Sequence, residues 1–271
     1  MLYKTDVLTR QADRQKYGVI APKVYNFHSL EQCFLMSRQY YAAPIIVRVS
    51  AEHLNLTEYA EWAKYFDKKY PQTQISLVAE DITTFEQAAK ACSVGYGGVA
   101  LADSILLNDE KNMGLIRQIT RIARASNTST QVSAGNIKAL KDGKGYELAV
   151  QAKVDILKLL PEESLNDANI AEYCTLIHAL RKQTLITLAM GGAALDDMKY
   201  YPQLKESGLS KFDAFESPSS AGVKRAKEVY EAEPEKTKKI FVLDLESALV
   251  KGYLDDVKQR MILAGNFAQR H

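Results

Sequence analysis

A lysine stands in the middle of the apolar run Val154–Leu160, which reads Val-Asp-Ile-Leu-Lys-Leu-Leu. A short apolar run between a helix-like segment and a Pro-Glu-Glu-Ser turn is typical of a strand that is buried on both faces. A buried ammonium group is costly unless it is paired or neutralised. Two interpretations of Lys158 therefore stay open: a structural cation that reaches a carboxylate or the solvent, or an amine nucleophile that forms an imine.

The imine interpretation requires a neutral amine, and the sequence holds features that act in both directions. Burial among apolar side chains lowers the pKa of a lysine, as does a neighbouring cation such as Lys23 or Arg48. Glu80 or Asp81 would then move protons as a general acid or base. A carboxylate that pairs with Lys158 would instead raise its pKa and keep it unreactive.

Apolar runs of strand length recur along the chain with amphipathic segments between them. The expected strands are Gly18–Val24, Pro44–Ser50, Gln74–Glu80, Gly98–Asp103, Thr130–Gly135, Val154–Leu160, Leu185–Gly192 and Lys211–Glu216. The expected helices include Ser29–Tyr41, Leu56–Lys69, Thr84–Val94, Glu110–Ala125, Asp167–Lys182 and Asp196–Ser207. Strands that alternate with helices favour a parallel sheet, and eight such units in 271 residues predict a (β/α)8 TIM barrel. An open doubly wound sheet is the alternative, but no Gly-x-Gly-x-x-Gly follows the first strand.

Residues 1–271 are expected to form one domain, with a segment at each end outside the eight units. Residues 1–16 are polar and charged and lack the apolar stretch of a signal peptide. Residues 223–271 are expected to form a helical extension that contains Val223–Ala232 and Leu243–Gly265. The second of these segments carries an apolar stripe that would pack on the barrel or on a partner subunit, so a homo-oligomer is one expectation.

Composition argues against several classes of partner. The formal net charge of +2 gives no electrostatic footprint for nucleic acid or for an anionic membrane, and no apolar run is long enough to span a bilayer. Cys33, Cys92 and Cys174 lie far apart in helix-like segments. They are expected to be free thiols in a reducing cytoplasm rather than a disulfide framework.

The barrel prediction directs attention to the carboxyl ends of the strands, where this fold carries its catalytic groups. The polar residues expected there are Lys23, Asn26, His28, Arg48, Ser50, Glu80, Asp81, Asp103, Ser104, Ser133, Asn136, Lys158, Glu162, Glu163, Asp213, Glu216 and Ser217. Lys158, Glu80 and Asp81 are the predicted catalytic residues. The predicted substrate-binding residues are Lys23, Arg48, Ser50, Asp103, Gly191, Gly192, Asp213 and Ser217.

Two small-residue segments predict a phosphate site. Gly191-Gly192-Ala193-Ala194 follows the seventh strand, and Ser217–Gly222 follows the eighth. Small residues let backbone N–H groups approach an anion, and these two loops are the recurrent phosphate site of the barrel. A phosphorylated ligand is therefore expected.

Metal chemistry has weaker support in the sequence. Catalytic zinc takes three protein ligands, usually including histidines. The chain has four histidines, of which only His28 follows a strand; the others are His53, His178 and His271. The acids Glu80, Asp81 and Asp103 could hold magnesium, or they could pair with the lysines and arginine.

Several segments resemble a known family: Tyr17–Pro22, Ser29–Gln32, Ala43–Ser50, Ile75–Glu80, Thr84–Ala88, Val94–Tyr96, Leu185–Gly192, Gly208–Asp213 and Asp256–Arg260. The chain resembles, along nearly its whole length, the class II zinc-dependent ketose-bisphosphate aldolases of the fructose- and tagatose-bisphosphate types. The resemblance implies a barrel that binds a sugar phosphate and cleaves a carbon–carbon bond. Ser50 and the pair Gly191-Gly192 match the family pattern.

The three zinc-binding histidines that the resemblance implies are absent. The family's Asp-His-Gly after strand 3 reads Glu80-Asp81-Ile82, and its His-Gly after strand 6 falls in Leu160–Glu163. Its His-Gly-Gly-Ser-Gly after strand 7 reads Met190–Ala194. The family's Asn on strand 8 aligns with Asp213. Zinc, and any other cofactor, is therefore not expected.

A second resemblance is short and concerns the lysine strand. Val154–Leu160 is similar to the strand of class I aldolases, of the deoxyribose-phosphate and tagatose-bisphosphate kinds, that carries an imine-forming lysine. It implies that Lys158 forms an imine and favours a metal-independent carbon–carbon lyase. The alternative is a catalytically inactive barrel that binds a sugar phosphate or serves as a subunit of an assembly.

Overall fold

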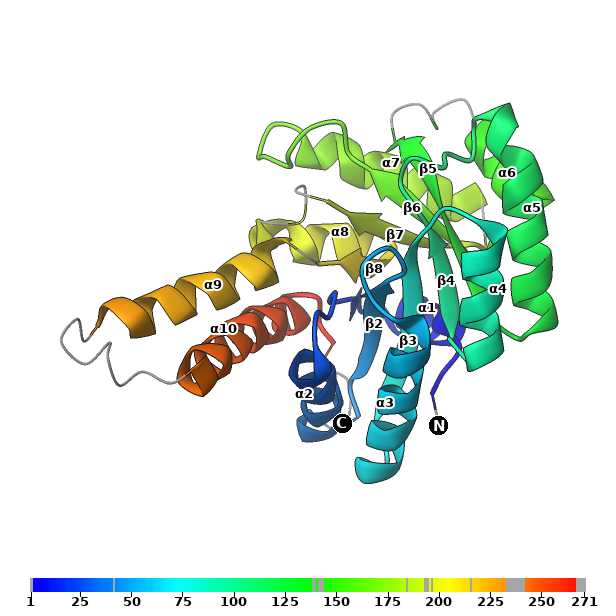
Figure 1. The fold of residues 1–271 in the computed structure, drawn as a ribbon. Coiled ribbons are helices and arrows are strands. Elements are labelled where there is room, and N and C mark those ends of the chain that lie inside the picture. Colours follow the sequence, from blue (N-terminus) through cyan, green and yellow to red (C-terminus); the bar gives the residue numbers. More distant parts are fainter. Residues whose placement is uncertain are drawn as a thin grey trace.

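Eight parallel strands form the centre of the computed structural model, which describes residues 2–266 except 41, 138–139, 141–143, 184, 193–194, 196, 215 and 233–241. The strands are β1 Val19–Ile20, β2 Pro44–Ser50, β3 Gln74–Ile82, β4 Gly98–Leu101, β5 Ser129–Asn136, β6 Ile156–Leu160, β7 Thr187–Gly191 and β8 Leu209–Asp213. Their order is β1-β8-β7-β6-β5-β4-β3-β2, and a bridge between Lys23 and Arg48 joins the β1 segment to β2. The predicted (β/α)8 barrel is thus confirmed (Figure 1).

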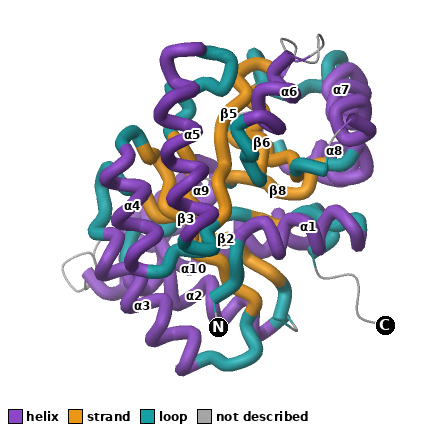
Figure 2. The backbone as a smooth tube through the Cα atoms, turned by 90° about the vertical axis from the view of Figure 1, so that its right-hand side faces the viewer, coloured by secondary structure: helices purple, strands orange, loops and turns teal. Residues whose placement is uncertain are grey.

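Helices follow the strands and cover the outside of the barrel (Figures 1 and 2). They are α1 Thr5–Gln15, α2 Phe27–Gln39, α3 Leu56–Lys69, α4 Phe85–Val94, α5 Glu110–Ala125, α6 Lys144–Gln151, α7 Ile170–Gln183, the 3-10 turn η3 Met198–Tyr200, α8 Tyr201–Ser207, α9 Glu216–Glu231 and α10 Val242–Leu263. Several of these helices begin after a polar N-cap residue. Asn26 caps α2, and Thr84 caps α4, each within a capping box.

Helix α1 closes the amino-terminal end of the barrel, although no element is predicted for residues 1–16. Its buried face combines Leu8 and Ala12 with Thr5 and Thr9. The two threonine hydroxyls lie 2.8 Å from Ser76 Oγ and 2.9 Å from the hydroxyl oxygen of Thr187, on β3 and β7. Two of these four side chains carry hydroxyl groups, so the buried face of α1 is less apolar than that of a typical amphipathic helix.

The last two helices form a hairpin beside the barrel (Figure 1). Ser217–Gly222 is expected to be a loop that binds phosphate, but it forms the first turns of α9, so the predicted loop conformation is wrong. A phosphate contact at the start of this helix stays a prediction. A Cβ atom on Gly222 would lie 2.6 Å from the backbone oxygen of Leu249. Close packing of α9 on α10 therefore explains the small residue at position 222, and the Ser217 side chain lies outside the described residues.

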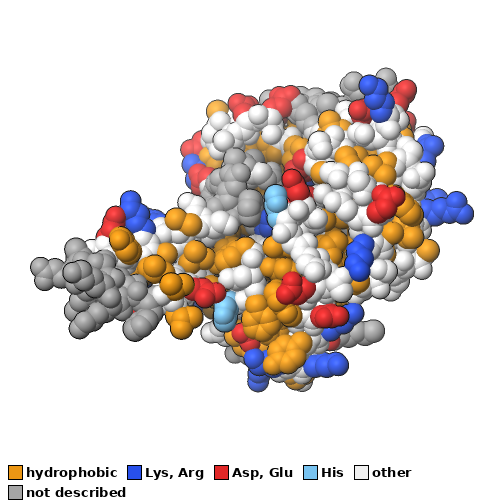
Figure 3. Space-filling model, in the orientation of Figure 1, with side chains coloured by type: hydrophobic (Ala, Val, Ile, Leu, Met, Phe, Trp, Pro, Cys, Tyr) orange, Lys and Arg blue, Asp and Glu red, His pale blue; other side chains and the backbone are white. Residues whose placement is uncertain are grey.

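The apolar stripe of the last helix packs on its own chain. Tyr253, Val257 and Met261 are fully buried against the rest of the chain. Val242 and Leu243, at the start of α10, are exposed, and hydrophobic side chains lie along the outer end of the hairpin in the space-filling view (Figure 3). None of the helices in the described part of the chain is long and apolar enough to cross a membrane.

Candidate active site

Arg48, on β2, forms hydrogen bonds to β3 and to the ends of β1 and β8 at the mouth of the barrel. Its Nη1 donates a hydrogen bond of 2.5 Å to Glu80 Oε1, and its Nε and Nη2 donate to the backbone oxygens of Ala21 and Ala214 at 2.8 and 2.9 Å. The side chain is buried. Since all three nitrogens are engaged within the protein, this guanidinium is placed to hold Glu80 rather than to reach a ligand.

Lys23, Ser50 and Asp81 form a second cluster beside it. Lys23 Nζ and Ser50 Oγ donate to Asp81 Oδ2 at 2.8 and 2.6 Å. Burial acts to raise the pKa of Asp81, but these two hydrogen bonds outweigh it and leave the pKa lowered. Asp81 is therefore an ionised carboxylate at neutral pH.

The backbone at Asp81 is in an unusual conformation. Its φ is +61°, and the pairing of β3 with β4 shifts register between Ala79 and Ile82. A non-glycine residue in the left-handed region is uncommon and is held only where surrounding contacts enforce it, often at functional sites. The shift turns the Asp81 side chain toward Lys23 and Ser50.

Lys158 lies on β6 at the mouth and pairs with Asp103, which follows β4. Its Nζ donates a hydrogen bond of 2.7 Å to Asp103 Oδ2, and the two side chains are 7% and 45% exposed. Burial acts to lower the pKa of Lys158, but the carboxylates of Asp213, Asp103 and Glu80 outweigh it and leave the pKa raised. The amine is therefore protonated at rest, with an accessible carboxylate as its hydrogen-bond acceptor.

Gly191 gives the Lys158 side chain its room. A Cβ atom on Gly191 would stand 2.8 Å from Lys158 Cε and 3.1 Å from Asp213 Cβ. Glycine is needed at this position because the Lys158 side chain lies against the backbone of β7 there. Gly192 has a φ of +84° and opens onto free space, so its backbone remains a candidate for contact with an anion.

Gly191→Ala is expected to lower the free energy of unfolding by about 1–3 kcal/mol, because the new methyl group must displace Lys158 or Asp213. Urea denaturation measures this change. Gly114→Ala is the matched control: the residue is exposed on α5, and a Cβ there meets nothing within 4 Å. That control is expected to be neutral or slightly stabilising. Equal stability of Gly191→Ala and the parent protein would show that Lys158 is not confined by Gly191.

A second buried lysine, Lys211, is absent from the predicted site. Its Nζ donates to Gln131 Oε1 at 2.7 Å and to Asp213 Oδ1 at 2.5 Å, and Gln131 Nε2 donates to Asp213 Oδ2 at 3.1 Å. The signal was present in the sequence, because residues two apart on a strand share a face and Asp213 is a predicted site residue. The expected strand began at Lys211, which put this residue far from the carboxyl end, whereas β8 ends at Asp213, only two residues later.

Burial and neighbouring charges together determine the ionisation of Asp213 and Lys211. Burial acts to raise the pKa of Asp213, but Lys211, Arg48 and Lys158 outweigh it and hold the pKa well below its usual range. Burial lowers the pKa of Lys211 despite the carboxylate beside it. The mouth thus consists of an outer layer around Lys158 and Asp81 and an inner layer around Asp213.

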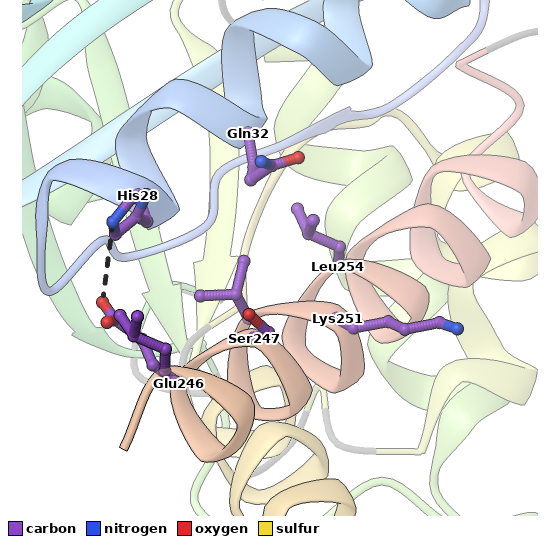
Figure 4. A pocket seen from close by; sticks show the side chains of 8 residues that line it. His28, Gln32, Glu246, Ser247, Lys251 and Leu254 are labelled. Carbon is purple, nitrogen blue, oxygen red and sulfur yellow. Dashed lines mark ion pairs between the residues drawn. The ribbon is translucent and has the colours of Figure 1, made fainter. Parts of the chain in front are cut away.

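The described histidines do not form a zinc site. His28 is expected to be the one histidine near the mouth, yet it lines a pocket between α2 and α10, where its Nε2 lies 3.9 Å from Glu246 Oε1 (Figure 4). His53 is exposed beside Glu52, and His178 lies on α7. The acids at the mouth pair with lysine or arginine, and no group of three potential ligands is found within the described ranges. This donor set does not fit zinc.

An eight-stranded barrel with its polar residues at the carboxyl ends of the strands has the organisation of a (β/α)8 enzyme scaffold. A model of the family "Fructose-bisphosphate aldolase class-II" matches residues 3–166, more than half of the 271 residues. The chain belongs to this family, which confirms the resemblance seen in its sequence.

Individual relatives agree with this assignment. A fructose-bisphosphate aldolase of Helicobacter pylori J99 is 23% identical over 145 residues, which cover 52% of this chain and 47% of that protein. The chain therefore matches about half the length of its curated relatives. The YdjI aldolase of Escherichia coli K12 has a similar structure, with a TM-score of 0.80, 14% identity and 99% coverage of both chains. A fructose-bisphosphate aldolase of Campylobacter jejuni gives 0.71 at 11% identity, over 97% of this chain and 93% of that one. At such identities the structures show the shared fold.

Proposed function

We propose that this chain is a lyase that cleaves a carbon–carbon bond of a phosphorylated sugar or keto acid through an imine on Lys158, without a metal. One observation carries the proposal: Lys158 Nζ lies at the mouth of an aldolase-family barrel, 2.7 Å from a half-exposed carboxylate that can accept its proton. Because the donor set at the mouth does not fit zinc, we assign the role of the electrophile to a protein residue. An iminium ion does this, because it withdraws electrons as a metal-bound carbonyl would.

The reaction begins with transfer of the ammonium proton of Lys158 to Asp103 and from there to the solvent. The neutral amine attacks the substrate carbonyl carbon and forms a carbinolamine. A proton returned from the solvent through Asp103 protonates the carbinolamine hydroxyl, and loss of water gives an iminium ion. The bond between the α- and β-carbons then breaks, and its electron pair forms an enamine. The β-hydroxyl loses its proton to Asp81 and becomes the aldehyde product. Protonation of the enamine and hydrolysis of the imine release the second product and restore Lys158.

Other groups at the mouth are suited to hold the substrate. Lys23 and Ser50 flank Asp81 at the mouth. The Lys23 ammonium group can attract an anionic substrate, and the Ser50 hydroxyl oxygen can accept a hydrogen bond. Glu80 Oε2 is buried, lies 3.5 Å from Lys23 Nζ and makes no hydrogen bond within the described residues. It can accept one from a substrate hydroxyl group. The backbone of Gly192 and the start of α9 are the proposed contacts for the phosphate.

Cleavage of ketose phosphates, with the aldehyde detected by a coupled enzyme, tests this function. The protein is expected to turn over at least one member of a panel of phosphorylated ketoses and keto acids, at the same rate with and without a chelator. Loss of activity on chelation, with recovery on adding back zinc or magnesium, would contradict the metal-free mechanism.

The cleavage rate is expected to rise about tenfold per pH unit from pH 7 to 9, because only the neutral amine attacks. The raised pKa of Lys158 places its titration above this range, since the ordinary value is 10.5. Initial rates at saturating substrate, with circular dichroism at each pH to confirm folding, give the profile. A flat or falling profile would argue against Lys158 as the nucleophile.

A second candidate function is binding of a sugar phosphate without turnover. The raised pKa of Lys158 favours it, because a protonated amine binds anions and does not attack carbonyl carbons. Thermal shifts with phosphorylated sugars, combined with no turnover across the panel, would support this second function and reject the first.

A further inference from the structure

The inner layer contains three side chains from β5 and β8 that form hydrogen bonds with one another inside the barrel. Lys211 and Asp213 lie on β8 and Gln131 on β5, and we call them the inner triad. Both oxygens of the Asp213 carboxylate are occupied, one by Lys211 and the other by Gln131. Lys211 is fully buried, so it cannot touch a substrate.

Asp213 also faces the proposed nucleophile. Lys158 Nζ and Asp213 Cβ lie 3.3 and 3.1 Å from the point where a Cβ on Gly191 would stand. The carboxylates of Asp213, Asp103 and Glu80 all act to raise the pKa of Lys158. The charges that act on Asp213 are the cations of Lys211, Arg48 and Lys158.

We infer that Lys211 is a positioning residue that acts on Lys158 through Asp213. Its ammonium group and the amide of Gln131 hold the Asp213 carboxylate down in the barrel, away from a direct hydrogen bond with Lys158. Its charge also offsets the negative field that Asp213 exerts on Lys158. The Lys158 amine therefore stays hydrogen-bonded to Asp103, the one described hydrogen-bond partner of its Nζ. Asp103 is also the carboxylate that can take its proton.

The consequence is that loss of Lys211 makes Lys158 a weaker nucleophile without removing a single contact to the substrate. With Lys211 replaced by an apolar residue, Asp213 is free to turn toward Lys158 and pair with it. Lys158 then holds its proton more tightly. The inference rests on the proposed function, in which Lys158 must become neutral.

Reductive methylation of Lys158 with formaldehyde and cyanoborohydride tests the inference on the full chain. Its rate follows the neutral fraction of the amine, needs no natural substrate, and is read for the Lys158 peptide by mass spectrometry at pH 8 to 9.5. Lys211→Met is expected to slow it about tenfold. Asp103→Asn, which removes a carboxylate that raises the pKa of Lys158, is expected to accelerate it by a similar factor.

Two further variants make the test specific. In an Asp213→Asn background, Lys211→Met is expected to change the rate by less than about twofold, because the residue through which Lys211 acts is gone. Arg260→Met is the matched control, since Arg260 is an equally buried cation whose hydrogen bonds go to Asp256, Leu195 and Tyr201 rather than to Lys158 or Asp213. It is expected to leave the methylation rate unchanged.

An unchanged or faster rate in Lys211→Met would overturn the inference, as would an equal effect in the Asp213→Asn background. If Lys211→Met fails to fold, Gln131→Leu frees the other carboxylate oxygen and is expected to slow methylation in the same direction, with no slowing counting against the inference. The outcome is separable from the proposed function. A slowed rate in Lys211→Met together with full cleavage activity in a Lys158 variant would reject the imine mechanism and keep the positioning role.

Discussion

Lys158→Arg lowers kcat for carbon–carbon cleavage by at least about a thousandfold, because the guanidinium keeps the positive charge but cannot form an imine. Arginine can still pair with Asp103, so the variant is expected to fold and to bind phosphorylated ligands with a similar Kd. Steady-state kinetics and calorimetric titration with the same ketose phosphate measure the two quantities separately.

Lys153→Arg is the control for this change, because Lys153 is an exposed lysine in the turn just before β6. It is expected to keep kcat within about twofold of the parent protein, as surface substitutions usually do. If Lys158→Arg retained more than a tenth of the parent activity, the charge of Lys158 rather than its nucleophilicity would be the required property.

Arg48→Met lowers the free energy of unfolding by about 3–5 kcal/mol, because it leaves the Glu80 carboxylate buried without its cation. It also removes the hydrogen bonds to Ala21 and Ala214 that join the end of β1 to the end of β8. Urea denaturation followed by circular dichroism gives the change in stability.

Two comparisons identify the cause of that loss. The double variant Arg48→Met/Glu80→Met is expected to be more stable than Arg48→Met alone, since neither charge is then buried unpaired. Arg181→Met removes a more exposed cation, paired with Asp13 and 16% exposed, and is expected to cost less than Arg48→Met. A loss below about 1 kcal/mol for Arg48→Met would show that Glu80 finds another partner.

Much of the barrel could be predicted from the sequence because its local signals agree with its tertiary structure. Pro44–Ser50 and Glu110–Ala125 have the predicted bounds, since each is a continuous pattern with clear flanking residues. The first strand was harder: Gly18–Val24 is the expected range, but only Val19–Ile20 pairs with β8. The chain leaves the ladder with β8 after two residues and forms a single bridge to β2 at Lys23.

The features that the sequence did not reveal depend on partners far along the chain. Lys211 is an ordinary lysine until β5 brings Gln131 to it, 80 residues away. Lys158 and Asp103 are separated by 55 residues, so their pairing, and the raised pKa that results, required the barrel to be closed. Ser217–Gly222 has the composition of a loop, but packing against α10 makes it helical.

The most direct test of the imine mechanism is borohydride trapping with a ketose phosphate that the protein cleaves. Borohydride reduces an iminium ion to a stable secondary amine, so the substrate stays attached to the lysine that it reached. Peptide mass spectrometry is expected to find a single adduct on Lys158 in the parent protein and none in Lys158→Arg. An adduct on another lysine, or full turnover with no adduct anywhere, would contradict the mechanism.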